Sequence, residues 1–247
     1  MLTKKKLGVF KQLHPTLRRW TTGVSILEKK FNNNTMKPSY NFSENNKVVL
    51  LESLNSVLSS FNVEDLIKVR AHYGHHKSCW HPAIKPFLYG TREDIHIIDL
   101  DQTIVQLKRS LTLLRTLAYN DVDILFTCAR MEYDQLIRHA CHKHNIFYVT
   151  RRWIPGTLTN SQTTIGRTER PGFMVIFSVE GNRVAIREAH QEFIPTLAII
   201  DTNIDPRIVT YPIVSSDDSK EAIELYLKLM CQAIEEGRSC KKYNTPL

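Results

Sequence analysis

Residues 123–153, DILFTCARMEYDQLIRHACHKHNIFYVTRRW, contain the pattern that decides the fold. The segments 123–129 and 146–153 are apolar runs of strand length, and the segment 131–144 between them carries apolar residues at helical spacing. Neither run alternates strictly between apolar and polar residues, which is typical of strands buried on both faces. The unit therefore predicts two parallel strands joined by a helix.

The same rhythm of strands and helices continues on both sides of this unit. The further expected segments are strands at 95–100, 172–179, 195–201 and 211–215 and helices at 103–119, 182–193 and 216–237. Residues 50–71 add a helical pattern in which Asn62 is placed to cap a helix. The predicted fold is α/β, a doubly wound and mostly parallel sheet flanked by helices.

The chain has 247 residues and a formal net charge of +8, and this charge lies in its N-terminal fifth. Residues 1–50 contain ten Lys and Arg residues against two Glu, whereas residues 51–247 contain 23 residues of each sign. We expect residues 1–47 to form a basic extension, disordered or loosely structured, and residues 48–247 to form a single α/β domain. A basic, hydroxyl-rich and acid-poor N-terminus is typical of an organelle transit peptide. The alternative is a disordered basic arm with no targeting role.

Composition disfavours several classes of protein. No apolar run approaches the roughly 18 residues that cross a bilayer, so we expect no membrane span. The five cysteines show no paired spacing, which disfavours a disulfide framework and suits a reducing compartment. The nine glycines form neither GxGxxG nor GxxxxGK(S/T), so the sequence lacks the loops that cradle nucleotide phosphates. We therefore expect no cofactor.

One polar loop keeps an enzyme interpretation open. The segment DTNIDP, residues 201–206, directly follows an expected strand. Asp201, Asn203 and Asp205 could form a nucleotide or metal site at the edge of the sheet, in an α/β enzyme. The preferred interpretation is that the two aspartates cap the loop, because Asx turns are common there and Asp-Pro begins a turn.

Histidines and cysteines gather in the segment HYGHHKSCWH, residues 72–81, and Cys141, His142 and His144 form a second group. Their spacing matches no paired zinc pattern, so zinc is disfavoured. A Cys–His nucleophile pair is a further alternative, but the sequence names no third group to orient the histidine.

Two windows of the sequence lack acids. Residues 66–92 and residues 135–168 each contain five Lys and Arg residues and no Asp or Glu, together with aromatic, Pro and Gly residues. Basic side chains without internal partners bind phosphates, and flat side chains stack on unpaired bases, so the windows indicate RNA binding. The alternative is that the basic residues are solvated on helix faces and the tryptophans belong to the core. This alternative is preferred for Trp80, Trp153, Arg138 and Lys143.

The expected strand at 146–153 ends in a pair of arginines, Arg151 and Arg152. The nearest acids along the chain are Asp134 and Glu169. We therefore expect neither arginine to have a carboxylate partner in the protein, and we expect both to bind phosphates.

Four segments carry a resemblance to a known family. They are AHYGHHKSCWHPAIKPFLYGTREDIHIIDLDQT (71–103), FYVTRRWIPGTLTN (147–160), IPTLAIIDTNIDP (194–206) and EEGRS (235–239). In order and spacing they resemble the small-subunit ribosomal protein S2 family, and the resemblance covers about residues 63–239. With the transit-like N-terminus, the chain is similar to the mitochondrial type of this family.

The resemblance implies a flavodoxin-like sheet and a structural role without catalytic activity. It implies binding to small-subunit ribosomal RNA and to neighbouring small-subunit ribosomal proteins, with no membrane association and no homo-oligomer. The implied place is the mitochondrial ribosome, in the matrix. The residues expected to contact RNA are His72, His75, Lys77, Lys85, Arg92, Arg151, Arg152, Thr159, Asn160 and Arg167.

The chain departs from the family pattern at three places. A long charged helical hairpin of the bacterial members is replaced by SQTTIGRTERP, residues 161–171. The usual Gly-Gly of the loop is Pro155-Gly156, which stiffens the turn. The basic N-terminal stretch has no equivalent in the family.

Overall fold

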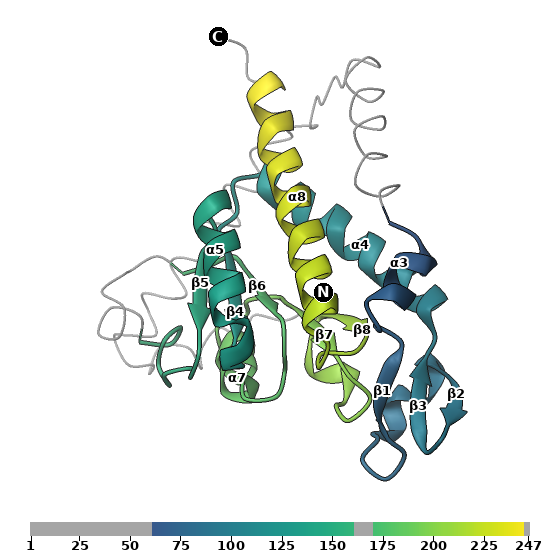
Figure 1. The fold of residues 1–247 in the computed structure, drawn as a ribbon. Coiled ribbons are helices and arrows are strands. Elements are labelled where there is room, and N and C mark those ends of the chain that lie inside the picture. Colours follow the sequence, from purple (N-terminus) through teal and green to yellow (C-terminus); the bar gives the residue numbers. More distant parts are fainter. Residues whose placement is uncertain (1–60, 161–169, 245–247) are drawn as a thin grey trace, which may run out of the picture. The chain divides into compact units, whose positions relative to one another are not determined.

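The computed structural model describes residues 61–160 and 170–244. Its main feature is a parallel sheet of five strands in the order β5-β4-β6-β7-β8 (Figure 1). The strands are β4 (Ile124–Cys128), β5 (Phe147–Thr150), β6 (Phe173–Ile176), β7 (Thr196–Ile200) and β8 (Tyr211–Val214). Numbered from β4, this is the 2-1-3-4-5 order of flavodoxin-like folds. The predicted α/β class, with a parallel sheet flanked by helices, is confirmed.

Helices cover the two faces of this sheet unequally (Figure 1). The first face packs against α3 (Val63–Lys68), α4 (Leu100–Tyr119), α5 (Asp134–His144) and α8 (Lys220–Asn244). Among the α-helices of the described ranges, only α7 (Arg183–Gln191) contributes to the core on the second face. Loops and short 3-10 turns complete that side.

Alternate residues along each strand supply the two cores. Phe126 and Val175 belong to the core of the first face, whereas Leu125 and Met174 belong to the core of the second. All four side chains are buried. This two-sided burial is why the strands read as continuous apolar runs in the sequence.

The first face depends on a close contact between α4 and α8. A Cβ atom at Gly237 of α8 would lie 2.3 Å from the backbone oxygen of Arg115 and 2.9 Å from the Cβ of Ala118, both on α4. Any larger residue would push the two helices apart, because side chains in a core are already close-packed. The glycine in the EEGRS segment therefore serves helix packing.

A small antiparallel sheet differs from the predicted arrangement. It contains β1 (Tyr73–His76), β2 (Leu88–Arg92) and β3 (Ile95–Ile98), in the order β1-β3-β2. The sequence rhythm suggested that the strand at 95–100 begins the parallel sheet, and this prediction is wrong. Glu93 and Asp94 both have positive φ values and form a two-residue turn, and such a turn can join only antiparallel strands.

The remaining predicted helices agree with the structure in type, with shifted ends. Asn62 precedes α3, and its backbone N–H donates to Asp65 at 3.1 Å; the earlier part of the 50–71 pattern lies outside the described residues. The predicted helix at 131–144 begins with a 3-10 turn, η4 (Met131–Tyr133), before α5. No helix in the described part of the chain has the length and hydropathy to cross a membrane.

Candidate RNA-binding surface

The carboxyl ends of the parallel strands carry a compact group of charged residues. Arg130 follows β4, Asp201 follows β7, and Asp217 and Asp218 follow β8. Arg130 donates to Asp217 at 3.1 Å and to Asp218 at 2.6 Å. The hydroxyl of Ser178, which follows β6, donates to the second oxygen of Asp217 at 2.9 Å. Four of the five parallel strands thus end in one network.

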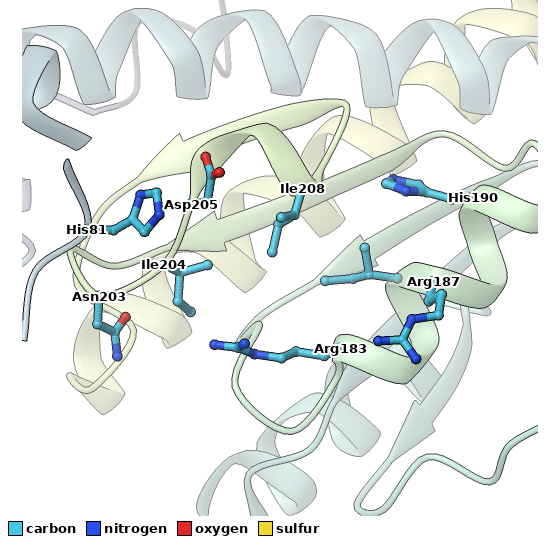
Figure 2. Close-up of a pocket in the computed structure, with 9 residues that line it drawn as sticks. His81, Arg183, Arg187, His190, Asn203, Ile204, Asp205 and Ile208 are labelled. Atoms are coloured by element: carbon cyan, nitrogen blue, oxygen red, sulfur yellow. The ribbon is translucent and has the colours of Figure 1, made fainter. Parts of the chain in front are cut away.

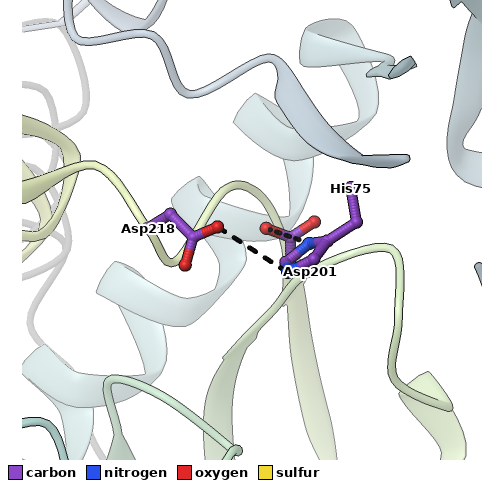
Figure 3. A group of neighbouring side chains, drawn as sticks. All are labelled: His75, Asp201 and Asp218. Carbon is purple, nitrogen blue, oxygen red and sulfur yellow. Dashed lines mark ion pairs between the residues drawn. The ribbon is translucent and has the colours of Figure 1, made fainter. Parts of the chain in front are cut away.

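His75 of β1 joins this group from the small sheet (Figure 3). Its Nδ1 lies 3.2 Å from Asp201 Oδ2 and its Nε2 lies 3.6 Å from Asp218 Oδ2, in the geometry of ion pairs rather than aligned hydrogen bonds. The interaction with Asp201, with a smaller contribution from Asp218, outweighs burial and raises the pKa of His75 to about 9. The ring is therefore a cation at neutral pH, held by two carboxylates of the protein.

Burial has the opposite effect on the acid at the centre of the group. It raises the pKa of Asp217 to about 6, against the lowering effect of Arg130. The charges of the network compensate one another only in part: two cations face four carboxylates, because Glu180 also lies 3.7 Å from Arg130. This edge is the usual ligand position in doubly wound folds. Here the protein fills it with its own ion pairs.

Three residues of the network could hold a metal ion by distance alone. Ligand atoms of His75, Asp201 and Asp218 lie within 4.8 Å of one another, and no other such group occurs in residues 61–160 and 170–244. A protonated imidazole repels a metal cation, and it already forms ion pairs with both carboxylates. The arrangement is that of an ion-pair cluster.

The alternative site at 201–206 does not converge. Asp205 caps the 3-10 turn η5 (Pro206–Ile208) by accepting from the Arg207 N–H at 3.0 Å. Asp201 is buried and faces His75 instead. The loop-capping interpretation is confirmed for Asp205, and no joint metal site of Asp201 and Asp205 is formed.

Arg151 contradicts one expectation from the sequence. Its Nε donates to Asp134 Oδ2 at 2.7 Å, and Asp134 also accepts from Arg138. Hydrogen bonds with Thr150 and with the two arginines lower the pKa of Asp134 to about 2. The prediction that Arg151 has no carboxylate partner is wrong.

The β-α-β geometry explains this pair. Asp134 is the first residue of α5, which begins near the carboxyl end of β4, and β5 runs parallel to β4. Arg151, directly after β5, therefore returns to the edge where α5 begins, and its N–H donates to Cys128 O at 2.9 Å. Residues 17 positions apart in sequence meet there.

Arg152, unlike Arg151, lacks a carboxylate partner among the described residues, as expected from the sequence. Its side chain is exposed, and no ion pair joins it to any residue of the described ranges. Thr159 and Asn160, further along the loop, are also exposed. Trp153, by contrast, is 4% exposed and belongs to the core of the second face, as the sequence analysis preferred.

A buried carboxylate on α7 holds this loop in place. Glu188, 6% exposed, accepts from the Gly156 N–H at 2.8 Å, from the Leu158 N–H at 3.1 Å and from the indole N–H of Trp153 at 3.3 Å. No salt bridge to Glu188 is found within the described part of the chain. These three N–H groups are therefore the donors that offset the cost of burying its charge. A buried carboxylate needs such donors. The loop and α7 therefore form one unit.

Gly156 makes the turn of the loop possible. Its φ is +91°, a conformation in which glycine avoids the clash of a Cβ with the backbone. Pro155-Gly156 thus keeps a glycine at the position of positive φ. The N–H of Asn160 closes the loop by donating to Gly156 O at 2.8 Å.

The predicted RNA contacts of the small sheet have mixed environments. Lys77 pairs with Asp94, and Arg92 lies 3.9 Å from Glu93 with its side chain 81% exposed. Lys85 is exposed and forms no ion pair with a described residue. It lies on the 3-10 helix η3 (Pro82–Phe87). His72 is half-buried, and burial lowers its pKa.

Thr202 fastens the small sheet to the edge of the large one. Its hydroxyl accepts from the His75 N–H and its carbonyl accepts from the His81 N–H, each at 2.8 Å. A Cβ at Gly74 would lie 2.5 Å from the Thr202 methyl group, so the contact requires a glycine there. Arg151 and His75 therefore lie at the same edge, whereas Arg92 lies at the far end of the hairpin.

Of the two acids that position the arginine loop, sequence reasoning dismissed Asp134 as a partner of Arg151 and did not name Glu188. The acid-free windows were defined along the chain, and both acids lie outside them. The excess of acids elsewhere in the domain was the available signal. Arg167 lies outside the described residues, so its predicted contact stays a prediction.

Comparisons with known proteins identify the class. A family model described as Ribosomal protein S2 matches residues 66–170 and 165–237 of the chain. The small ribosomal subunit protein uS2m of Schizosaccharomyces pombe is 35% identical over 200 residues, covering 72% of this chain and 76% of the relative. The small ribosomal subunit protein uS2 of Amoebophilus asiaticus is 31% identical over 223 residues, covering 72% and 71%. That of Gluconacetobacter diazotrophicus is 29% identical over 227 residues, covering 74% and 87%.

These matches cover the parallel sheet, the arginine loop and most of α8. The protein is therefore of the ribosomal, structural class and is not an enzyme, which ends the enzyme interpretation of the 201–206 loop. The chain belongs to the ribosomal protein S2 family.

Proposed function

We propose that the protein is a structural constituent of the mitochondrial small ribosomal subunit that supports mitochondrial translation. It binds small-subunit ribosomal RNA through the arginine loop, residues 151–160, and through the basic residues of the small sheet. Neighbouring small-subunit ribosomal proteins are its other partners. The bacterial and mitochondrial relatives carry names of small-subunit proteins, which supports this assignment.

The observation that carries the RNA contact is Arg152. It is an exposed guanidinium on a loop whose backbone is fixed by Glu188, and no carboxylate among the described residues neutralises it. An unpaired guanidinium on a held backbone is suited to phosphate because its planar donors match two phosphate oxygens. Arg151 supplies a second guanidinium beside it, with a side chain that is 60% exposed despite its ion pair.

Salt dependence tests this contact. With about five phosphate contacts, the slope of log affinity against log salt for a transcript of the small-subunit ribosomal RNA is expected near −3 to −5. Arg152→Glu removes a contact and adds a repulsion, so it should weaken binding and make the slope less negative. Arg109→Glu on α4, which is also exposed, is the matched control. A flat salt dependence of the unchanged protein would rule out the proposed surface.

The mitochondrial part of the proposal rests on two supports. One is the relative named uS2m, and the other is the basic, acid-poor composition of residues 1–47. We propose that residues 1–47 are a transit peptide and that residues 48–247 form one domain in the matrix. A reporter fused to residues 1–50 should enter mitochondria, and replacement of its arginines 18 and 19 and lysines 4, 5 and 6 by Glu should prevent entry. A cytosolic reporter would refute the compartment and leave the RNA contact standing.

A further inference from the structure

A cavity of about 560 Å³ opens on the second face of the sheet, beside α7 (Figure 2). Ile186 of α7, Ile204 of the loop after β7 and Ile208 of η5 line its floor. Arg183 and Arg187, one helical turn apart on α7, stand at its rim. In Figure 2 the Arg183 side chain extends from the helix toward Asn203.

The floor of the cavity is apolar and ordered. Ile186 and Ile204 are each 4% exposed, and Ile208 packs against the same core. Ile208, which is half-buried, therefore offers most of the apolar side-chain surface below the polar rim. Binding sites for small groups combine apolar walls with a few placed polar groups, and the volume lies within their range of about 300–1,000 Å³.

The rim carries positive charge without compensation. Both Arg183 and Arg187 are exposed, and neither forms an ion pair with another residue in the described ranges. Among the described residues that line the cavity, Asp205 is the only acid, and it is engaged by the Arg207 N–H at 3.0 Å and by Arg207 Nε at 3.5 Å. Two guanidinium groups therefore face the opening with no protein anion assigned to them.

The cavity lies between the two stretches that the proposed function assigns to RNA. On one side, Glu188 of the same helix holds the loop of Trp153 and Leu158. On the other side, His81 lines the cavity and caps η3, the turn that carries Lys85, by accepting from the Ala83 N–H at 3.3 Å. A strand of RNA that contacts both stretches would pass over this opening.

We propose that the cavity binds an unpaired nucleotide of the small-subunit ribosomal RNA. Arg183 and Arg187 hold successive phosphates of its backbone, and the base lies on the isoleucine floor. Their Cβ atoms, about 5–6 Å apart as one-turn neighbours, allow one guanidinium for each phosphate. Proteins read unpaired RNA through such splayed-out bases. The inference rests on the proposed function and extends it to a site that sequence analysis did not name.

A pair of variants separates the two halves of the site. Arg183→Ala with Arg187→Ala should weaken binding of the full chain to the ribosomal RNA transcript and make the salt slope less negative by about 1 for each lost phosphate contact. Ile208→Trp fills the floor and changes no charge. It should weaken binding by several-fold and leave the salt slope as it was, because no phosphate contact is lost.

Arg109→Ala on α4 is the matched control for the arginine variant, since it removes the same charge from an exposed helix on the other face. It should leave both affinity and slope unchanged. Circular dichroism and thermal unfolding of each variant check the fold. Crosslinking of a 4-thiouridine transcript should place nucleotide adducts in the segments 183–190 and 203–208 and lose them in the tryptophan variant.

Distinct outcomes overturn the proposal. If the Arg183/Arg187 variant binds like the Arg109 control while Arg152→Glu binds weakly, the cavity does not take RNA and the proposed function stands. If the unchanged protein does not bind the transcript at all, both fail. If RNA affinity persists but the Arg183/Arg187 variant no longer associates with a neighbouring ribosomal protein, the occupant is an acidic peptide and the nucleotide assignment is wrong.

Discussion

The two faces of the parallel sheet are built for different tasks. The first face is covered by α3, α4, α5 and α8, and its core extends over most of these helices. The second face has α7 as its helix, and much of its cover consists of the arginine loop, η3 and the loop after β7. Loops tolerate irregular backbone and present donors outward, whereas packed helices satisfy their backbone internally.

This difference separates stability from binding. Unpaired arginines of the second face stand on α7 and on the loop that Glu188 holds, so its packing and its proposed contacts share the same residues. On the first face, the close contact at Gly237 involves helix atoms only. Changes on the first face should therefore alter unfolding alone, whereas changes to the residues that hold the second face together, such as Glu188, should alter unfolding and RNA binding together.

The largest expected effect is at Glu188. Glu188→Ala leaves the Gly156, Leu158 and Trp153 N–H groups without their acceptor, which should lower the free energy of unfolding by about 3 kcal/mol. The loop also loses its fixed shape, so RNA affinity should fall in the same variant. Urea unfolding and filter binding measure the two effects.

Two controls sharpen the test at Glu188. Glu188→Gln keeps one acceptor oxygen and should cost less, about 1–2 kcal/mol. Glu224→Ala removes an exposed acid from α8 and should change neither quantity. If Glu188→Ala unfolds early but binds RNA with the affinity of the unchanged protein, the loop is not part of the binding surface.

The complementary change on the first face is Gly237→Ala. The added methyl group meets the backbone oxygen of Arg115, and this clash outweighs the better helix propensity of alanine, worth about 1 kcal/mol. We expect a net loss of about 2 kcal/mol in the free energy of unfolding. The salt slope of RNA binding should be unchanged. Ser239→Ala, at an exposed position of the same helix, is the control; a loss of RNA affinity in folded Gly237→Ala would contradict the division between faces.

Arg151 and Arg152 should differ in their effect on stability, because only Arg151 has an ion pair with Asp134. Arg151→Glu places a carboxylate beside Asp134 and should lower the free energy of unfolding by about 1–2 kcal/mol, a modest cost because the arginine is partly exposed. Arg152→Glu should change it by less than about 0.5 kcal/mol. Both should weaken RNA binding. Equal melting temperatures for the two variants would mean that the ion pair with Asp134 contributes nothing.

The last expected effect is a pH dependence of the free energy of unfolding, caused by His75 at the carboxyl ends of the parallel strands. The folded-state pKa of His75, about 9, lies above the unfolded value of about 6.5, so its stabilising contribution is complete below pH 6.5 and is lost as pH rises through 9. Solvent exposure of the ring reduces this contribution to about 1 kcal/mol. His75→Gln should remove it. Unfolding free energies of both proteins, measured between about pH 6 and pH 9 and subtracted, isolate this residue; a flat difference would contradict the ion pairs with Asp201 and Asp218.

The parallel sheet was predictable because its signal is local. Each strand is buried on both faces and therefore forms an apolar run, and each helix has its own period. The strand at 95–98 was predicted as a strand and assigned to the wrong sheet. Its pairing is decided by the positive φ values of Glu93 and Asp94. The sequence Glu-Asp does not predict such a turn, because Asn-Gly and Asp-Gly are the usual residues there.

For the candidate surface, the sequence predicts the exposure or burial of single residues but not their partners. The exposure of Arg152 and the burial of Trp153 follow from position at a strand end and from residue type. The partners of the loop do not, because Asp134 is 17 residues from Arg151 and Glu188 is 32 residues from Gly156. Their contacts are set by where α5 begins and by which face α7 covers, and these are tertiary facts.

The ion pair of Arg151 with Asp134 has a thermodynamic consequence beyond its charge. An arginine side chain carries about 2 kcal/mol of rotamer entropy, which a mobile residue loses when it is immobilised on a ligand. Asp134 holds the Nε of Arg151 and, in doing so, aims the guanidinium. Part of the side-chain entropy of Arg151 is thereby lost when the protein folds. Less entropy is then lost when Arg151 binds a ligand. Asp134 also pairs with Arg138, so one negative charge is shared by two positive ones and the site stays electropositive after pairing. In the proposed phosphate contact, Asp134 would therefore orient the Arg151 guanidinium before the RNA binds.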